Sequence, residues 1–301
     1  MADYELSPAS EDGPRGGTSR PVRVGLIVCL LVICIMAIVI GYLGYLVWAQ
    51  RSSGPTDYVS GIVLGRCLSF TRIARPELRD KDCKKILDAF KSAFVSKDPC
   101  SITREDYQPL INLTADPVPC DKSLFWSRSK ELVHEYTGIQ KEMFTLEDTL
   151  LGYMGDGLTW CGDPRTSEIK HESCPHRNET CNSTATYVFW NVISQKFAES
   201  ACGTVYVMLN GSRDTPFSKA STFGGVEIFN LRPEKVHTLQ AWVMHNVEAV
   251  SRDTCSGSSI RELKSIVEQR KISFECYNDY RPARFIQCVK HSSHPTCRAL
   301  L

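Results

Sequence analysis

The sequence predicts an α+β ectodomain with an α/β-type C-terminal part, held behind a single membrane span near the N-terminus. Helix-like patterns dominate the first half of the ectodomain, and continuous apolar runs typical of buried strands appear in the second. A run of uncharged apolar residues precedes the ectodomain, and 12 of the 14 cysteines follow that run. The balance of 35 Lys and Arg against 34 Asp and Glu excludes a strongly basic nucleic-acid-binding protein.

Residues 24–49 form the apolar segment and contain no charged side chain. Such a run is long enough to cross a bilayer with some tilt. Signal peptides have apolar cores of about half that length, which favours an uncleaved span over cleavage after Ala49. We therefore predict a cytoplasmic tail at residues 1–23, a transmembrane helix at 24–49 and an ectodomain at 50–301 that begins with a short stalk, residues 50–56.

The cysteines and the glycosylation motifs indicate the orientation of the chain. Two of the 14 cysteines, Cys29 and Cys34, lie in the apolar segment, and an even dozen follow it, which indicates disulfide bonds and an oxidising compartment. Four N-x-[ST] acceptors, at Asn112, Asn178, Asn182 and Asn210, also follow the segment. These features predict a glycosylated single-pass type II protein of the plasma membrane with an extracellular C-terminal part. Near spacing suggests the bridges Cys67–Cys83, Cys161–Cys174, Cys255–Cys276 and Cys288–Cys297.

One constellation resembles a metal site. Cys288, His291, His294 and Cys297 are four possible zinc ligands at even spacing. In an oxidising compartment the two cysteines pair with each other more readily, so we favour a disulfide bond over zinc. The glycines Gly152, Gly155 and Gly157 follow a helix and not a strand, which does not favour a phosphate-binding loop. Motifs for dinucleotide binding, P-loops, serine hydrolases and zinc proteases are absent from the sequence.

Several elements can be placed by pattern. The run Thr145–Asp148 has the form of a capping box and predicts a helix start ahead of Leu150. The periodicity and the apolar runs predict helices at 124–136, 187–202 and 260–270, and buried strands at 205–209, 226–229 and 239–244.

The candidate functional residues are acids and tryptophans. Glu227 lies within an apolar run, where burying an ionised carboxylate is costly unless it serves a function; alternation along a strand would instead turn it to water. Glu147 and Asp148 are equally compatible with stabilising a first helical turn. Trp126 and Trp190 are compatible with core packing or with stacking on a ligand.

At these residues the sequence resembles the ADP-ribosyl cyclase family. The resemblance lies in Leu124-Phe-Trp-Ser-Arg128, Thr145-Leu-Glu-Asp-Thr-Leu-Leu-Gly152, Leu158-Thr-Trp-Cys161, Phe189-Trp190 and Ser221-Thr-Phe-Gly-Gly-Val-Glu227. It covers essentially the whole ectodomain. The family has soluble, lipid-anchored and type II membrane forms, and the apolar segment makes this chain similar to the type II form.

The resemblance implies a cleft between two lobes, with the chain crossing between them more than once. The helical lobe would comprise about 50–119 and 145–201, and the lobe with a small parallel sheet about 120–144 and 202–301. The family pattern also implies the bridges Cys100–Cys181 and Cys120–Cys202, for six in all.

Residue roles are likewise implied by the resemblance. Glu227 corresponds to the catalytic carboxylate, and Glu147, the second residue expected to be catalytic, lies beside the nicotinamide and would set the product distribution. Trp126 and Trp190 would flank the nicotinamide, Glu147 and Asp156 would approach its amide, and the residues expected around the ribose and diphosphate are Ser127, Arg128, Ser194, Thr222 and Phe223.

The implied activity is cleavage of the nicotinamide–ribose bond of NAD to ADP-ribose and cyclic ADP-ribose, with hydrolysis of cyclic ADP-ribose. NAD is then a substrate, and no cofactor or metal is expected. The expected binding partners are NAD, nicotinamide and cyclic ADP-ribose, and the sequence leaves open whether the chain forms a homodimer. Two other classes share parts of the pattern: a non-enzymatic adhesion or receptor ectodomain, and an ectoenzyme acting on sugar glycosides.

Overall fold

The computed structural model describes residues 30–44, 57–116, 118–298 and 300. The chain divides into two units, residues 1–55 and 56–301. In the first, residues 30–44 are helical with exposed side chains. No helix among the described residues is both long enough and apolar enough to cross a bilayer. The predicted span at 24–49 lies partly outside the described residues, and the predicted tail (1–23) and stalk (50–56) lie wholly outside them.

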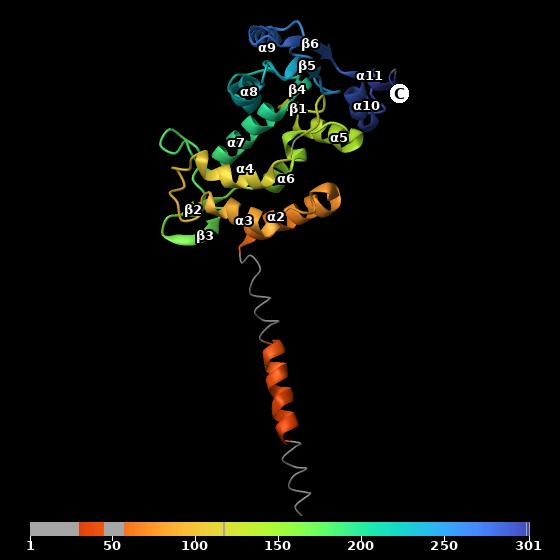
Figure 1. Cartoon of the computed structure of the whole chain (residues 1–301). Helices are drawn as coiled ribbons and strands as arrows, with labels where there is room; N and C mark the ends of the chain where they lie inside the picture. Colours follow the sequence, from red (N-terminus) through yellow and green to blue (C-terminus); the bar gives the residue numbers. More distant parts are fainter. Residues whose placement is uncertain (1–29, 45–56, 117, 299, 301) are drawn as a thin grey trace, which may run out of the picture. The chain divides into compact units, whose positions relative to one another are not determined.

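The second unit contains helices and two sheets (Figure 1). The α-helices are α2 (Tyr58–Ser69), α3 (Cys83–Ser92), α4 (Gln108–Thr114), α5 (Lys130–Gln140), α6 (Leu150–Gly155), α7 (Ala185–Ser200), α8 (Ile228–Asn230), α9 (Ser258–Gln269), α10 (Arg281–Lys290) and α11 (Pro295–Arg298). Two π-helices, η1 (Phe70–Ala74) and η5 (Phe223–Glu227), and three 3₁₀ turns, η2 (Pro76–Leu78), η3 (Glu105–Tyr107) and η4 (Leu146–Asp148), lie between them. The strands are β1 (Leu124–Ser127), β2 (Cys161–Asp163), β3 (Thr166–Lys170), β4 (Gly203–Asn210), β5 (Val236–Met244) and β6 (Ser273–Asn278).

The main sheet has four strands in the order β1-β4-β5-β6, and all neighbouring pairs are parallel. Parallel strands need crossover connections, and helices supply them here. Strands β2 and β3 form a separate antiparallel pair. Figure 1 shows β4, β5 and β6 next to α8–α11, with α2, α3, α4 and α6 gathered beyond α7. The predicted mixture of helices with a small parallel sheet is confirmed.

Both faces of the main sheet are covered along its inner strand β4. Val205, Val207 and Leu209 of β4 pack into the large core that includes α7 and α9, while Met208 faces a second core with α5 and α10. Because neither face meets water, both side-chain rows of the strand are apolar. This explains why the continuous run 205–209 predicts a buried strand correctly, and the strand predicted at 239–244 is confirmed within β5 for the same reason.

The helix predicted at 124–136 is wrong in its first part. Leu124–Ser127 is strand β1, paired with β4 from Leu124↔Tyr206 to Ser127↔Leu209, and the helix begins only at Lys130. Leu124 faces the second core and Phe125 the first, so both must be apolar. A short apolar run of this kind is equally compatible with a helix, and the pairing with a distant strand decides between them.

The strand predicted at 226–229 is also wrong, because these residues belong to η5 and α8. Two glycines permit the helical path. A Cβ on Gly224 would lie 2.2 Å from the carbonyl oxygen of Ser218, and one on Gly225 would lie 2.8 Å from that of Lys219. The π-helix therefore packs directly against the preceding backbone, which a side chain at Gly224 would prevent. The alternation hypothesis that turned Glu227 to water fails as well, since that residue is 6% exposed.

Other helical predictions are confirmed, with shifted boundaries. The helix predicted at 187–202 is α7, and the one at 260–270 is α9. The capping box exists: the Thr145 backbone and hydroxyl both donate to Asp148 Oδ2, at 2.8 and 2.9 Å. It stabilises a 3₁₀ turn, η4, and α6 then starts with its own cap at Thr149.

Six disulfide bonds close the second unit, and they join the pairs expected from spacing and from the family pattern: Cys67–Cys83, Cys100–Cys181, Cys120–Cys202, Cys161–Cys174, Cys255–Cys276 and Cys288–Cys297. Cys288 and Cys297 are therefore bonded to each other. No group of three or more His, Cys, Asp or Glu side chains in the described chain is placed to hold a metal ion.

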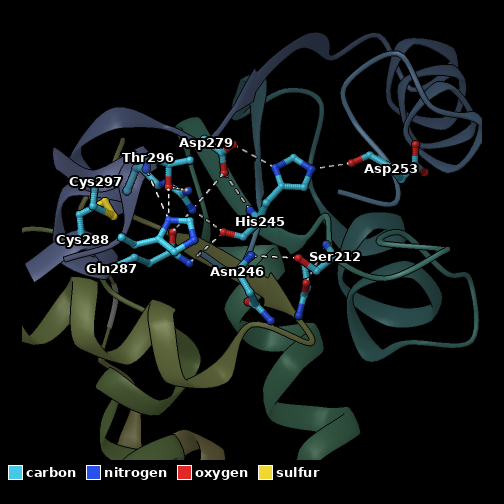
Figure 2. Close-up of polar contacts among 12 residues, drawn as sticks. Ser212, His245, Asn246, Asp253, Asp279, Gln287, Cys288, Thr296 and Cys297 are labelled. Atoms are coloured by element: carbon cyan, nitrogen blue, oxygen red, sulfur yellow. Dashed lines mark hydrogen bonds and ion pairs between the residues drawn. A yellow bond between two sulfur atoms is a disulfide. The ribbon is translucent and has the colours of Figure 1, made fainter. Parts of the chain in front are cut away.

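A buried histidine fixes the end of β5 (Figure 2). His245 Nδ1 lies 3.1 Å from Asp279 Oδ2, and its Nε2 lies 2.8 Å from the carbonyl oxygen of Asp253. The His245 carbonyl accepts hydrogen bonds from Arg284 and Gln287 of α10. These contacts tie β5 to the loop before α9, to the end of β6 and to α10.

Candidate functional site

A cavity of about 560 Å³ lies where five separate segments meet. The segments are β1 with the residues after it, η4, the loop after α6, one face of α7, and η5 with the two residues before it. This volume is typical of a site for a small molecule or nucleotide.

Trp126 and Ser127 enter the cavity from the end of β1. The Trp126 indole Nε1 donates to Glu147 Oε2 at 3.2 Å. Trp126 also meets the His134 ring edge-on, with the ring centroids 6.0 Å apart. The capping box that closes η4 fixes the backbone of Glu147, and the indole fixes one of its carboxylate oxygens. Among the described residues, none donates a hydrogen bond to the second oxygen, Oε1.

Strand β1 ends in a constrained turn. Arg128, which lines the cavity, has φ 57°, a left-handed conformation uncommon for a residue with a side chain. Its carbonyl accepts a hydrogen bond of 3.1 Å from Asn210 Nδ2 at the end of β4. The neighbouring strand therefore holds the turn that directs Arg128 to the cavity. Such backbone strain persists where the surrounding structure enforces it.

Helix α7 presents one face to the cavity. Trp190, Ser194 and Phe197 are spaced at i, i+4 and i+7, so they lie above one another on the same side of the helix. Ser194 and Phe197 are buried and Trp190 is half-buried. The predicted apolar stripe of this helix therefore packs into the core, with Trp190 at its edge facing the cavity.

Glu227, the last residue of η5, is the buried acid of the site. The pKa of its carboxyl is raised from the ordinary 4.5 to about 8: burial is the main cause, the negative charge of Glu147 adds to it, and a hydrogen bond from Ser194 opposes both effects. Desolvation disfavours the ionised carboxylate, and a second carboxylate nearby disfavours it further. An acid with so large a shift, facing a cavity, is a strong candidate for a functional group.

Asp156 lies at the C-terminal end of α6, where its carboxylate forms a 2.7 Å ion pair with Lys130 of α5. Its backbone is held separately: Arg66 Nη1 donates to the carbonyl oxygens of Met154 at 3.1 Å and Asp156 at 2.6 Å. Carbonyls in the last turn of a helix lack helical partners, and Arg66 supplies one from α2.

The structure brings together all ten residues predicted for catalysis or substrate binding. The cavity is lined by Trp126, Ser127, Arg128, Glu147, Asp156, Trp190, Ser194, Thr222, Phe223 and Glu227. The sequence interpretation missed Lys130 and Ser221. Ser221 Oγ accepts from the Gly224 amide and donates to the Ser218 carbonyl, which fixes the turn before η5. Its position at the head of the Ser221–Glu227 run was the available signal; Lys130 had none.

The fold and the cavity define a disulfide-bonded α+β protein in which a buried carboxyl and two indoles line one cavity. The chain belongs to the ADP-ribosyl cyclase family: the family model matches residues 56–297. It is 69% identical to "ADP-ribosyl cyclase/cyclic ADP-ribose hydrolase 1" of Oryctolagus cuniculus over 301 residues, covering 100% of both chains. It is 30% identical to the Aplysia californica enzyme of the same family name over 81% of this chain and 88% of that one.

Solved structures agree with this assignment. Porcine CD38, in a complex described as a covalent intermediate with ribo-F-ribose-5'-phosphate, matches 75% of this chain and 97% of its own with a TM-score of 0.71 at 54% identity. Aplysia cyclase, complexed with substrate NGD and product cGDPR, matches 81% of this chain and 98% of its own with a TM-score of 0.73 at 29% identity.

Proposed function

We propose that this cavity cleaves the nicotinamide–ribose bond of NAD to give ADP-ribose and cyclic ADP-ribose, and that it also hydrolyses cyclic ADP-ribose. The observation that carries the proposal is Glu227, a carboxyl 6% exposed on the wall of a cavity that also contains two tryptophans. The identity to family enzymes over the full chain supports it. NAD is consumed in this reaction, so it is a substrate and not a cofactor.

The charge of NAD suits the state of Glu227. With a pKa raised to about 8, the Glu227 carboxyl is mostly protonated at neutral pH in the empty cavity. The nicotinamide of NAD is a pyridinium cation, and an opposite charge within a few ångströms favours the carboxylate. Substrate binding therefore displaces the proton and leaves an anion beside the ribose. That anion gains most as C1′ becomes positively charged during bond breaking.

Nicotinamide leaves as a neutral molecule, so the reaction needs no strong general acid. Trp126 and Trp190 are proposed to stack on the pyridine ring. The free carboxylate oxygens of Glu147 and Asp156 are proposed to accept hydrogen bonds from its amide. The ribose and diphosphate would contact Ser127, Arg128, Ser194, Thr222 and Phe223, among which Arg128 supplies positive charge for the phosphates.

The ribosyl intermediate can then react in two ways. Water can attack C1′, which releases ADP-ribose and returns a proton to the solvent. The adenine of the same molecule can attack instead, which closes cyclic ADP-ribose. Hydrolysis of cyclic ADP-ribose forms the same intermediate when the bond between C1′ and adenine breaks, and water then attacks C1′. The product ratio then depends on whether the tryptophans hold adenine near the ribose or leave space for water.

The topology and the lobes belong to the proposal too. We propose that residues 24–49 anchor the chain as a single-pass type II protein in the plasma membrane, with residues 50–301 outside the cell. The six disulfide bonds support an oxidising compartment. The acceptors Asn112, Asn178 and Asn182 are exposed and Asn210 is half-buried, which suits glycosylation of at least the first three. The proposed lobes, 50–119 with 145–201 and 120–144 with 202–301, would meet at the cavity.

The decisive experiment incubates the purified chain with NAD, with cyclic ADP-ribose and with a panel of sugar glycosides, and measures the products of each by chromatography. The proposal expects nicotinamide, ADP-ribose and cyclic ADP-ribose from NAD, ADP-ribose from cyclic ADP-ribose, and no cleavage of the glycosides. An adhesion or receptor ectodomain would release nothing. A sugar glycosidase would cleave the panel and leave NAD intact.

A further inference from the structure

The direction in which the Arg128 side chain points depends on its backbone. The residue lines the main cavity, and its φ of 57° is a left-handed value that persists only where the surrounding structure enforces it. Among the described residues, no ion pair or hydrogen bond fixes the guanidinium itself. The Arg128 carbonyl, by contrast, accepts a hydrogen bond of 3.1 Å from Asn210 Nδ2. The position of the Asn210 side chain therefore controls the turn that directs Arg128 to the cavity.

Asn210 begins a short turn after β4, residues 210–212, which is called the 210–212 turn below. Within the turn, Asn210 Oδ1 accepts a hydrogen bond of 3.0 Å from the Ser212 amide, which sets the direction of the Asn210 side chain. Toward β5, the Gly211 amide donates to the Met244 carbonyl at 2.7 Å. Ser212 Oγ accepts a hydrogen bond of 2.9 Å from the Asn246 amide (Figure 2). The end of β5 thus holds one side of the turn.

His245 and the loop before α9 hold the other side of the 210–212 turn. The Gly211 carbonyl accepts from the amides of Arg252 and Asp253, at 3.0 and 3.1 Å. The Asp253 carbonyl in turn lies 2.8 Å from His245 Nε2, and because a carbonyl oxygen only accepts, Nε2 carries a proton and donates it. The ring also touches the turn directly, since a Cβ on Gly211 would lie 2.5 Å from Nε2. The turn therefore rests against the His245 ring and against the loop that this ring holds.

The His245 ring is itself fixed by Asp279, which follows β6. Asp279 Oδ1 accepts from the His245 amide at 2.9 Å, and Oδ2 lies 3.1 Å from Nδ1 (Figure 2). The His245 side chain is 9% exposed, and the loss of a polar partner at a site so buried is destabilising. Neither residue lines the main cavity, so an effect of this pair on the reaction has to reach the cavity through the 210–212 turn.

We propose that His245 is a positioning residue for the cleavage of NAD and that it acts on Arg128 through the 210–212 turn. The inference rests on the proposed function, in which the Arg128 guanidinium binds the diphosphate of NAD. Without the His245 ring, the turn and the Asn210 side chain shift, and the Arg128 backbone is free to leave its left-handed conformation. The guanidinium then no longer points steadily at the phosphates. Because the diphosphate is remote from the bond that breaks, this loss weakens the ground state and the transition state equally.

The first experiment measures the steady-state kinetics of the full-length chain in detergent. His245→Phe keeps a ring in the core and removes both nitrogens, and it is expected to raise KM for NAD at least about fivefold while kcat stays within about twofold. KM for cyclic ADP-ribose, which carries the same diphosphate, should rise likewise. His237→Phe, at an exposed histidine of the same strand, is the matched control and should change neither constant. An unchanged KM for NAD in a folded His245→Phe protein overturns the inference.

Two substitutions of Asp279 test the same contacts without a new ring in the core. Asp279→Leu removes both acceptors from a side chain that is 36% exposed, and it should raise KM as His245→Phe does. Asp279→Asn keeps an acceptor for the His245 amide and offers an amide group to Nδ1, so KM should stay within about twofold of the wild type. Equal KM values for the two Asp279 variants would contradict a role for these hydrogen bonds.

A double-mutant cycle then tests whether the effect of His245 requires Arg128. Adding His245→Phe to Arg128→Gln should change KM for NAD by less than about twofold, although the same substitution raises it at least about fivefold when Arg128 is present. Equal factors in the two backgrounds would assign His245 to the general stability of the fold and overturn the inference. If the unmodified chain releases no nicotinamide from NAD, the proposed function itself fails, whereas release with independent effects of the two substitutions overturns this inference alone.

Discussion

Replacing Glu227 with Gln keeps the size and polarity of a side chain that is 6% exposed and removes its ability to ionise. The substitution has two expected effects of opposite sign. The folded protein becomes more stable at neutral and alkaline pH, and the cleavage of NAD is lost. Both follow from the same cause, a carboxylate buried beside another carboxylate, Glu147.

The size of the stability effect follows from the pKa of Glu227, raised from 4.5 to about 8 on folding. Below about pH 4.5 the carboxyl is protonated in both states, and its contribution to stability is fully present. As the pH rises toward 8, only the unfolded state ionises, so this contribution is lost. The wild type then falls behind Glu227→Gln by about 3 kcal/mol at pH 7 and by at most about 5 kcal/mol above pH 8, with little difference near pH 5.

The same substitution should also slow the cleavage of NAD strongly. Gln cannot supply the negative charge that stabilises a cationic ribose, and removing one such electrostatic contribution typically costs about 3 to 4 kcal/mol in the transition state. Turnover should fall by at least about two to three orders of magnitude, and further if Glu227 forms a covalent bond to C1′. Equilibrium binding of NAD should change far less, because the charge matters most after the bond begins to break.

The assay combines urea unfolding at pH 5, 7 and 9, with the disulfide bonds intact, and single-turnover release of nicotinamide. Glu172→Gln is the matched control, since that side chain is 89% exposed and should show no comparable pH-dependent gain. A stability difference that does not grow with pH would show that Glu227 is not a strained buried acid. A mutant that turns over within about tenfold of the wild type would remove it from the catalytic role.

Three further outcomes are expected. First, kcat/KM for NAD should rise with pH to a plateau, with a midpoint near 8, the pKa of Glu227 in the free protein. The midpoint for kcat should lie at lower pH, because bound pyridinium favours the carboxylate. Coinciding midpoints in the two pH–rate profiles would contradict this coupling. Second, Glu147→Gln should move the kcat/KM midpoint to lower pH, because it removes a negative charge near Glu227. Glu147→Phe should increase the share of cyclic product, as measured by chromatography. Complete loss of cleavage in a folded Glu147→Phe protein would assign Glu147 to bond breaking. Third, Gly224→Ala should lower turnover at least about tenfold, since its Cβ would lie 2.2 Å from the Ser218 carbonyl and displace η5; wild-type kinetics would show that the helix tolerates the shift.

Much of the fold could be predicted where local pattern and tertiary environment agree. The run 205–209 is apolar at every position because both faces of β4 are covered, so the strand prediction holds. The Thr145–Asp148 capping box depends only on residues three apart and forms as predicted. The four bridges suggested by spacing lie between cysteines 9 to 21 residues apart, where proximity in sequence is informative.

The two wrong elements depend on partners distant in sequence. Leu124–Ser127 becomes a strand because Tyr206–Leu209 lies beside it, more than eighty residues away. Phe223–Glu227 becomes a π-helix because its glycines accept the backbone of Ser218 and Lys219 at close range. Neither contact leaves a periodic signal, and both segments carry site residues. The pattern left the role of those residues open, and the resemblance to a family is what assigned them to one site.

Glu227 shows both what the sequence could predict and what it could not. Its position in an apolar run already indicated that burying the ionised carboxylate would be unfavourable unless a function explained it. In the structure, a hydrogen bond from Ser194 stabilises the carboxylate, but the nearby negative charge of Glu147 destabilises it. A structural role would have selected a cationic partner at that position. Instead, two indoles line the same cavity, and no salt bridge among the described residues involves Glu227. In the proposed function the missing positive charge is the one that NAD brings, so the local conflict with folding favours Glu227 as the catalytic group.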